Sequence, residues 1–143
     1  MSINPIVSNP AEEVAVEAAL AEFHAALNAM FSGDLEPMEA VWSHRDDVIY
    51  MGPAGGYRIG WQQVRADWAA QAALKLGGSA HPEQIRITLN GNQAIVCNIV
   101  KGKNIDPEGN PMPVSLRVSS IFRRESGQWK VMTMHTDLLP FLR

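Results

Sequence analysis

Residues 115–137, which read as two β-strands joined by a Glu-Ser-Gly turn, constrain this chain more than any other stretch. Side chains on a strand alternate between its two faces, so Arg117 and Ser119 share a face of the first strand. By the same rule, His135 and Asp137 share a face of the second strand. A sheet that buries such groups beside apolar residues must satisfy their hydrogen bonds. The pattern therefore predicts that these side chains turn inward and line an enclosed pocket floored by the sheet.

Length and charge limit the domain organisation and the partners. A chain of 143 residues fits one domain, residues 1–143, with one hydrophobic core. The net charge of -3 at pH 7 gives no basic face, so nucleic acid is excluded as a predicted partner. Cys97 is the only cysteine, which excludes an intrachain disulfide. Its apolar neighbours predict an inert core residue.

The N-terminus bears on the location of the protein. Residues 1–8 read as a loose leader without the basic start and apolar segment of a signal peptide. No apolar run approaches the roughly 20 residues that are needed to cross a bilayer. We therefore expect no membrane partner and a cytoplasmic location.

Apolar spacing and turn signals predict the order of the elements. Asn9-Pro10 is typical of a helix start, and Ser32-Gly33 of a helix end. The nearly continuous apolar run at 94–100 predicts a central strand covered on both faces. The expected helices cover residues 10–31, 34–42 and 61–76, and the expected strands cover 48–51, 57–59, 85–89, 94–100, 115–124 and 128–137. This order indicates an α+β fold, in which helices cover one face of a curved antiparallel sheet and leave a cavity beneath them.

Short motifs along the chain resemble a known superfamily. They are AALNA at 25–29, GDL at 33–35, DVIYMGP at 47–53, GW at 60–61, SLR at 115–117, FRR at 122–124, GQWKV at 127–131 and HTD at 135–137. With these motifs, residues 12–139 resemble the nuclear transport factor 2-like (NTF2-like) superfamily, and within it the SnoaL-like or ketosteroid-isomerase-like small proteins. The resemblance implies a cone-shaped cavity between sheet and helices, and a homodimer formed through the outer face of the sheet.

Steroid isomerase chemistry in this superfamily needs three groups, whose positions the resemblance supplies. A carboxylate acts as the base, while a phenol and a protonated carboxylic acid hold the developing oxyanion. The base position is Gly52, the acid position is Ser120, and the phenol position is Ala26 or Phe23. All three depart from the pattern, so we do not expect a steroid isomerase of that mechanism.

Four residues are candidates for catalysis: His135, Asp137 and Tyr50, considered first, and Arg117. A carboxylate on the same strand face can fix the tautomer of an imidazole and raise its basicity, which suits acid–base chemistry. Alternatively, His135 is a satisfied wall residue and Asp137 caps the strand end. Tyr50, on the first strand, either donates to a ligand carbonyl or serves as an amphipathic wall residue.

Arg117 is the fourth candidate for catalysis. It lies between Leu116 and Val118, and a buried guanidinium needs an anionic partner. It either binds a substrate carboxylate or enolate, or it pairs structurally with Asp137 or Glu108.

Five further residues are predicted to bind substrate. They are Trp42, Trp61, Trp68, Ser119 and Met51. The tryptophans fall on apolar helix stripes, which indicate core packing or, alternatively, an aromatic wall for a flat or cyclic ligand.

Metal and cofactor binding are not expected. His44, His81, His135 and Asp137 are the best set of ligands, but their spacing matches no compact metal motif.

Two functions remain open at this point. The first is a cofactor-free acid–base enzyme for a small organic molecule, of the isomerase, cyclase, dehydratase or hydrolase type. The second is a non-catalytic ligand-binding or dimerisation module. A small organic ligand and a second copy of the chain are the predicted partners.

Overall fold

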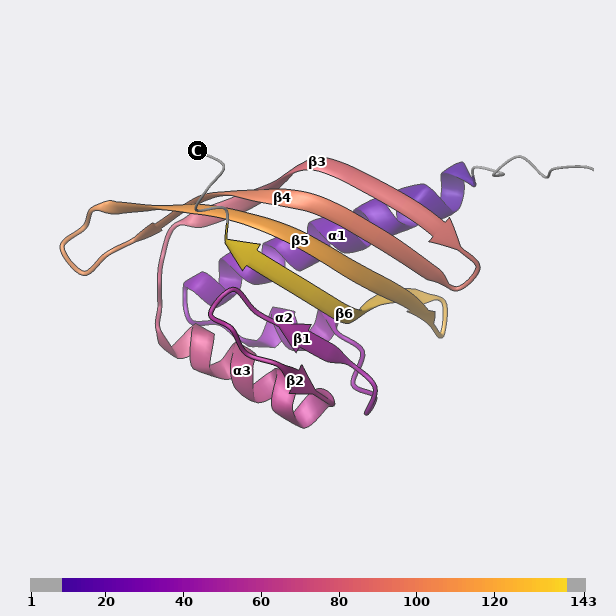
Figure 1. Cartoon of the computed structure of the whole chain (residues 1–143), viewed down its shortest axis with the longest axis horizontal. Coiled ribbons are helices and arrows are strands. Elements are labelled where there is room, and N and C mark those ends of the chain that lie inside the picture. The colour runs from indigo at the N-terminus through magenta and orange to yellow at the C-terminus, as the bar shows by residue number, and fades with distance from the viewer. Residues whose placement is uncertain (1–8, 139–143) are drawn as a thin grey trace, which may run out of the picture.

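The computed structural model describes residues 9–138 as three helices and a six-stranded sheet (Figure 1). The elements are α1 (Pro10–Phe31), α2 (Glu36–Val41), β1 (Ile49–Met51), β2 (Arg58–Ile59), α3 (Trp61–Ala73), β3 (Ser79–Asn90), β4 (Gln93–Ile105), β5 (Pro111–Glu125) and β6 (Gln128–Leu138). The strand order in the sheet is β2-β1-β6-β5-β4-β3. This architecture confirms the α+β class and the helix-then-hairpin order. The leader predicted at residues 1–8 lies outside the described residues.

Local capping explains the bounds of α1. The Asn9 side chain accepts a hydrogen bond from the backbone N–H of Glu12 at 3.2 Å, and Pro10 occupies the first helical position. After Phe31 the chain leaves the helix through Ser32 and Gly33, the latter with a φ of 96°.

α1 is long and apolar enough to pass a length and hydropathy test for a membrane helix. Half of that window is buried within the fold, as in the core helix of a globular protein.

The sheet carries its helices on one face. Figure 1 shows α1 behind β3, β4 and β5, with α3 beside β1 and β2. β3, β4, β5 and β6 pair with their neighbours through antiparallel hairpins, but β1 pairs with β6 in parallel. The sheet is therefore mixed, whereas the sequence predicted an antiparallel sheet. The core lies between the helices and the face that they cover, which we call the inner face. We call the opposite face the outer face.

A β-bulge in β6 decides which side chains face the core. β5 and β6 pair Ile121 with Thr133 but Phe122 with Val131, so Met132 is an extra residue in β6. A one-residue slip moves every following side chain to the other face of a strand. Residues 129 and 131 are therefore buried, and after the bulge Met134 and Thr136 are buried. The alternation read from the sequence put residues 129–137 in one unbroken register, which is wrong beyond Met132.

β4 alternates between the two faces, contrary to the prediction of a strand covered on both. Ala94, Val96 and Val100 are buried, whereas Ile95 is 44% exposed and Cys97 is exposed. No helix covers the outer face of the sheet within residues 9–138, so outward residues of a continuous apolar run reach solvent. The prediction of Cys97 as a core residue is wrong for the same reason.

Candidate functional site

A cavity of about 220 Å³ lies between the helices and the inner face of the sheet, and we call it the interior cavity. It opens to solvent beside the exposed residues Pro113 and Leu138. Its lining residues come from α1 and α3, from β1 and the following loop, from the α3–β3 connection, and from the strands β4, β5 and β6. They are Phe23, Leu27, Phe31, Tyr50, Pro53, Trp68, Gln71, Leu76, Val100, Asn104, Pro113, Val114, Leu116, Val118, Met134, Thr136 and Leu138. None of these side chains is charged. The cavity therefore suits an apolar molecule with few polar groups.

Tyr50 contributes a phenol hydroxyl to the lining of this cavity. Its side chain is only 1% exposed, and its ring stacks on Trp68 with centroids 4.5 Å apart. Trp42 packs edge-on against the same ring at 5.8 Å. Two aromatic neighbours hold the phenol in one orientation.

A short polar chain reaches Tyr50 from α3. The Gln71 side-chain amide donates to the Tyr50 hydroxyl oxygen at 3.0 Å, and the same nitrogen donates to Asp67 Oδ1 at 3.0 Å. Arg58 Nε donates to the other carboxylate oxygen of Asp67, also at 3.0 Å. Asp67 and Gln71 are four residues apart, which places both on one face of the helix.

Tyr50 stays protonated in this environment. Burial raises the pKa of the phenol well above its ordinary value, and the nearby Asp67 charge raises it further. The hydrogen bond from Gln71 opposes this shift without cancelling it. The group is therefore a hydrogen-bond donor rather than a base.

Gly52 provides the space that the phenol occupies. A Cβ atom built at Gly52 would lie 2.9 Å from the Tyr50 hydroxyl oxygen, so a side chain there would displace the phenol. Gly52 stands at the base position of the steroid isomerase pattern. A carboxylate at that position and Tyr50 in its present orientation exclude one another. Ser120, at the acid position, is buried and donates to the Val96 carbonyl at 3.3 Å.

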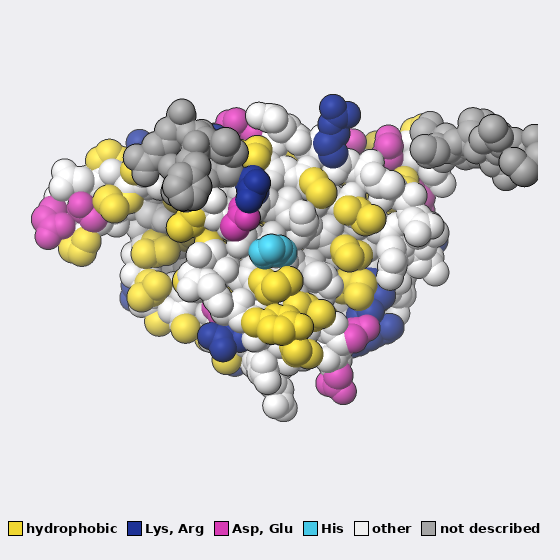
Figure 2. Space-filling view, viewed as in Figure 1, with side chains coloured by type: hydrophobic (Ala, Val, Ile, Leu, Met, Phe, Trp, Pro, Cys, Tyr) yellow, Lys and Arg dark blue, Asp and Glu magenta, His cyan; other side chains and the backbone are white. Residues whose placement is uncertain are grey.

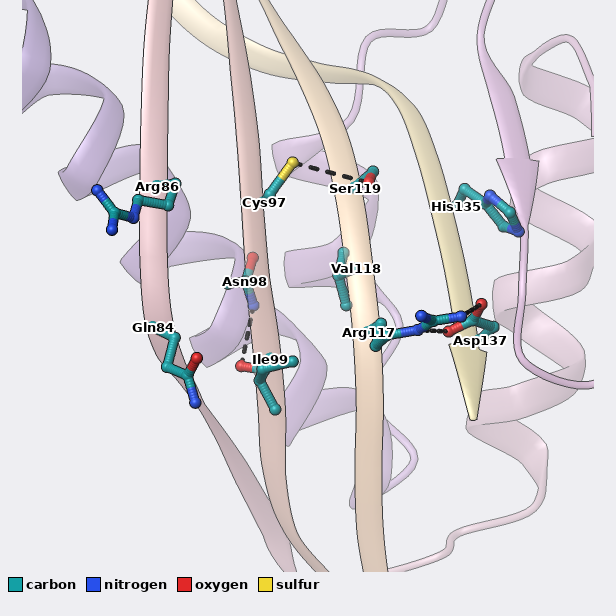
Figure 3. Close-up of a pocket in the computed structure, with 10 residues that line it drawn as sticks. All are labelled: Gln84, Arg86, Cys97, Asn98, Ile99, Arg117, Val118, Ser119, His135 and Asp137. Carbon is teal, nitrogen blue, oxygen red and sulfur yellow. Dashed lines mark hydrogen bonds and ion pairs between the residues drawn. The ribbon is translucent and has the colours of Figure 1, made fainter. Parts of the chain in front are cut away.

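A second, shallower groove of about 430 Å³ lies on the outer face of the sheet (Figure 3). It is lined by Gln84, Arg86, Cys97, Asn98, Ile99, Arg117, Val118, Ser119, His135 and Asp137. The strand register aligns Cys97 with Ser119 and Ser119 with His135. Figure 3 shows the Arg117–Asp137 pair next to this row. Three of the four predicted catalytic residues thus meet in this groove, on the face opposite Tyr50.

Arg117 and Asp137 pair with each other. Two hydrogen bonds of 2.8 and 2.7 Å join the guanidinium to the carboxylate, and the side chains are 57% and 42% exposed. The hydrogen bond from Arg117 lowers the pKa of Asp137, and the same bond raises the pKa of Arg117. His135 is exposed and makes no hydrogen bond within residues 9–138. The prediction that these side chains turn inward is therefore wrong, because the Met132 bulge puts His135 and Asp137 outside.

Comparison with known proteins identifies the family. Residues 16–138 match the model of the SnoaL-like domain. This chain belongs to the SnoaL-like domain family. Among solved structures, it resembles a candidate dehydratase of the NTF2-like family from Streptomyces avermitilis, with a TM-score of 0.81 and 18% identity over 93% of this chain and 99% of that one.

Two further structures share the fold. A candidate calcium/calmodulin-dependent protein kinase type II association domain from Thiobacillus denitrificans has a TM-score of 0.71 and 24% identity, over 95% of this chain and 99% of that one. An uncharacterised protein with a cystatin-like fold from Caulobacter vibrioides has a TM-score of 0.72 and 15% identity, over 90% of each chain. The search of curated proteins gave no match. The family match confirms the superfamily that the sequence motifs indicated, and the structural likenesses confirm the fold.

The structure separates the five residues predicted to bind substrate. Trp68 lines the interior cavity of the SnoaL-like domain, and Trp42 lies in the aromatic layer that supports Tyr50. Trp61 does not line the cavity and instead stacks on His44 at 4.1 Å. Ser119 lies in the outer groove. Met51 is not part of the cavity lining, and its carbonyl accepts a hydrogen bond from Thr136.

The sequence reasoning missed Gln71, whose amide holds the Tyr50 hydroxyl. A signal was present, because Gln71 follows Trp68 by three residues on a helix and so shares its buried face.

Among residues 9–138, no three His, Cys, Asp or Glu side chains are grouped so that they could hold a metal ion.

Proposed function

We propose that this SnoaL-like domain binds a small organic molecule in the interior cavity, with Tyr50 and Trp68 as its main contacts, and does not transform it by proton abstraction. The observation that carries this proposal is a largely apolar cavity of about 220 Å³ whose lining, among the described residues, includes the buried Tyr50 hydroxyl and no charged side chain.

The absence of a base in the cavity lining favours binding over acid–base catalysis. Proton abstraction needs a carboxylate, an imidazole or an amine within hydrogen-bond reach of the substrate. Among the described residues, the polar lining consists of Tyr50, Gln71, Asn104 and Thr136, none of which is a base at neutral pH. His135 and Asp137 could act as bases, but they lie on the other side of the sheet.

A cavity-filling substitution tests this proposal. Leu116→Trp places an indole in the cavity, whereas the control Glu22→Trp adds the same group on the exposed side of α1. Uncharged ring compounds should raise the unfolding temperature of the wild type and of Glu22→Trp, but not of Leu116→Trp. At about 100 times its Kd, a ligand adds about 2.7 kcal/mol to the free energy of unfolding.

Two results would overturn the proposal. Compounds that stabilise Leu116→Trp as much as the wild type would place the binding site elsewhere. A product that forms with time from a bound compound, and fails to form with Leu116→Trp, would show catalysis in the cavity.

We further propose that two copies associate through the outer face of the sheet. Ile95 is 44% exposed there, and Ile99 and Ile121 lie on the same face as the Arg117–Asp137 pair. Figure 2 shows hydrophobic side chains on this face around a histidine and a neighbouring pair of opposite charges. An antiparallel arrangement of two such faces can pair each charge with its opposite. A structural neighbour is named as an association domain, which agrees with this proposal.

Light scattering after size-exclusion chromatography tests the association. The wild type should elute as a dimer and Ile95→Lys as a monomer, since a buried unpaired ammonium opposes association. Glu22→Lys, on the exposed side of α1, should remain a dimer. A monomeric wild type at high protein concentration would contradict the proposal.

A further inference from the structure

We infer that Asp67, which lies outside the cavity, fixes Tyr50 as a hydrogen-bond donor, so that the cavity selects uncharged ligands of about one substituted ring that carry an acceptor oxygen. This inference rests on the proposed function, because it names the class of molecule that the interior cavity holds. Asp67 is a positioning residue here, since it acts on the ligand only through Gln71 and Tyr50.

The carboxylate of Asp67 sets the direction of donation along the hydrogen bonds that join Asp67, Gln71 and Tyr50. An ionised carboxylate only accepts hydrogen bonds, so Gln71 must turn its NH2 group, and not its carbonyl, toward Asp67. The second hydrogen of that NH2 group is donated to the Tyr50 oxygen, with both N···O distances at 3.0 Å. The Tyr50 oxygen is thus an acceptor toward the protein.

The hydrogen of the Tyr50 hydroxyl remains available. No acceptor for it is found within residues 9–138, although the phenol is 1% exposed. A buried hydroxyl hydrogen without an acceptor is unfavourable. Because Tyr50 lines the cavity, a ligand that brings an acceptor oxygen to this hydroxyl supplies the missing bond.

Asp67 is itself held in place by the segment before α3. Arg58 Nε donates to its Oδ2, and the Asp67 side chain is 15% exposed. Gly56 lies against the same carboxylate, since a Cβ atom built there would be 3.0 Å from Oδ2. Within residues 9–138, Gln71 is the hydrogen-bond donor to Oδ1, and the held carboxylate keeps the NH2 end of that amide turned toward it.

Charge and volume narrow the ligand further. A carboxylate or an ammonium in this cavity would be buried without a counter-charge, because no lining side chain among the described residues is charged. An apolar cavity of about 150 Å³ holds benzene. A volume of about 220 Å³ therefore leaves room for a ring with a short substituent, such as an aryl ketone.

Three probes of nearly equal shape test the inference by calorimetry. Acetophenone has an acceptor oxygen, ethylbenzene has none, and benzoate is charged. The wild type should bind acetophenone and ethylbenzene but not benzoate. In Tyr50→Phe, the affinity for acetophenone relative to ethylbenzene should fall by roughly 5- to 150-fold, the range for a buried carbonyl that loses its donor.

Asp67→Asn should produce the same loss without touching the cavity. Arg58 should hold the carbonyl oxygen of the substituted amide, which turns the NH2 group of that side chain toward Gln71. The Gln71 carbonyl then faces both this NH2 group and Tyr50, so the phenol donates to Gln71 and no longer to the ligand. Asp46→Asn, at an exposed carboxylate with no hydrogen bond within residues 9–138, should keep the wild-type ratio.

The outcomes separate this inference from the proposed function. An unchanged acetophenone-to-ethylbenzene ratio in Tyr50→Phe and Asp67→Asn would overturn the inference, while binding that Leu116→Trp abolishes would still support a ligand cavity. A loss in Tyr50→Phe but not in Asp67→Asn would overturn the role of Asp67. Binding of benzoate, or of none of the three probes, would overturn the ligand class.

Discussion

The inner and outer faces of the β5–β6 hairpin both carry polar residues, but they use them differently. On the inner face, Ser120 and Thr136 are 1% and 7% exposed, and each donates to a backbone carbonyl at 3.3 Å. On the outer face, the charged pair Arg117–Asp137 remains in solvent. A short hydroxyl can be buried because a nearby carbonyl satisfies it, whereas a charge is costly to bury even when it is paired. Polar residues in a strand therefore do not by themselves reveal a pocket.

Charged residues on the outer face also differ from one another in their exposure to solvent. Arg123, near the far end of β5, is 13% exposed and binds Asp47, Glu125 and Ser43 at 2.6–3.0 Å. Ser43, which is 1% exposed, also donates to Glu125 at 2.6 Å. This cluster ties the segment before β1 to the sheet. Within residues 9–138, Arg117 forms hydrogen bonds of similar length with Asp137 alone, and its side chain is 57% exposed. The two arginines should therefore differ in their effect on stability.

The largest difference between the faces should appear at adjacent positions of β5. Phe122 is 1% exposed on the inner face, and its replacement by Ala should lower the free energy of unfolding by about 3–5 kcal/mol. Ile121→Ala, one residue away on the outer face, should cost much less. Urea unfolding at low protein concentration measures both. Equal losses would mean that the outer face is as well packed as the core.

The two arginines give the next largest contrast. Arg123→Met leaves two carboxylates and the buried Ser43 without their shared donor. It should lower the free energy of unfolding by roughly 1.5–3 kcal/mol, the range for hydrogen bonds to charged groups. Arg117→Met removes an exposed pair and should leave the urea midpoint of the monomer nearly unchanged. A large effect at Arg117 alone would reverse our ranking of the two sites.

The Arg123 cluster should also make stability depend on pH. Hydrogen bonds from Arg123 lower the pKa of Asp47. For Glu125, burial acts to raise the pKa, but hydrogen bonds from Ser43 and Arg123, together with the positive charges of Arg45 and Arg123, outweigh it and the pKa is lowered.

Because both folded-state values are depressed, this contribution is complete above the unfolded-chain values of about 3.9 and 4.3, and it is lost as pH falls through the folded values. Urea midpoints measured from about pH 6 to about pH 3, a range that brackets those values, should fall less steeply in Arg123→Met than in the wild type. Parallel curves would assign the acid sensitivity to other carboxylates.

The smallest expected effect concerns one buried histidine, His24. His24 is 6% exposed, its Nδ1 bonds to the Leu20 carbonyl at 3.0 Å, and its Nε2 has no partner within residues 9–138. Burial lowers the pKa of His24, so its contribution to stability is complete above about 6.5 and declines as pH falls through the lower folded value. The dependence is at most about 1.4 kcal/mol per pH unit for one proton.

His24→Leu should therefore flatten the stability profile between neutral and mildly acidic pH. Thermal unfolding at several pH values would measure the profile. An unchanged profile in His24→Leu would assign the pH dependence in this range to other groups.

The sequence by itself determined what depends on neighbours along the chain. The Asn9 cap, the Ser32-Gly33 stop and the turn at residues 125–127 are local signals, and the structure confirms each of them. The apolar stripe of α1 and the family motifs fixed the fold class for the same reason, since spacing along one element is visible in one sequence. Tyr50 was also predicted as the phenol of a pocket, and it lines the cavity.

Only the tertiary structure decided which side chains share a site. The bulge at Met132 arises from the pairing of β6 with β5, and it moved His135 and Asp137 to the outer face. The hydrogen bonds from Asp67 through Gln71 to Tyr50 join α3 to β1, and Tyr50 and Gln71 are 21 positions apart in the sequence. Strand register and the contact between a helix and a sheet are set by packing over the whole core, and a pattern of residue spacing contains no record of either.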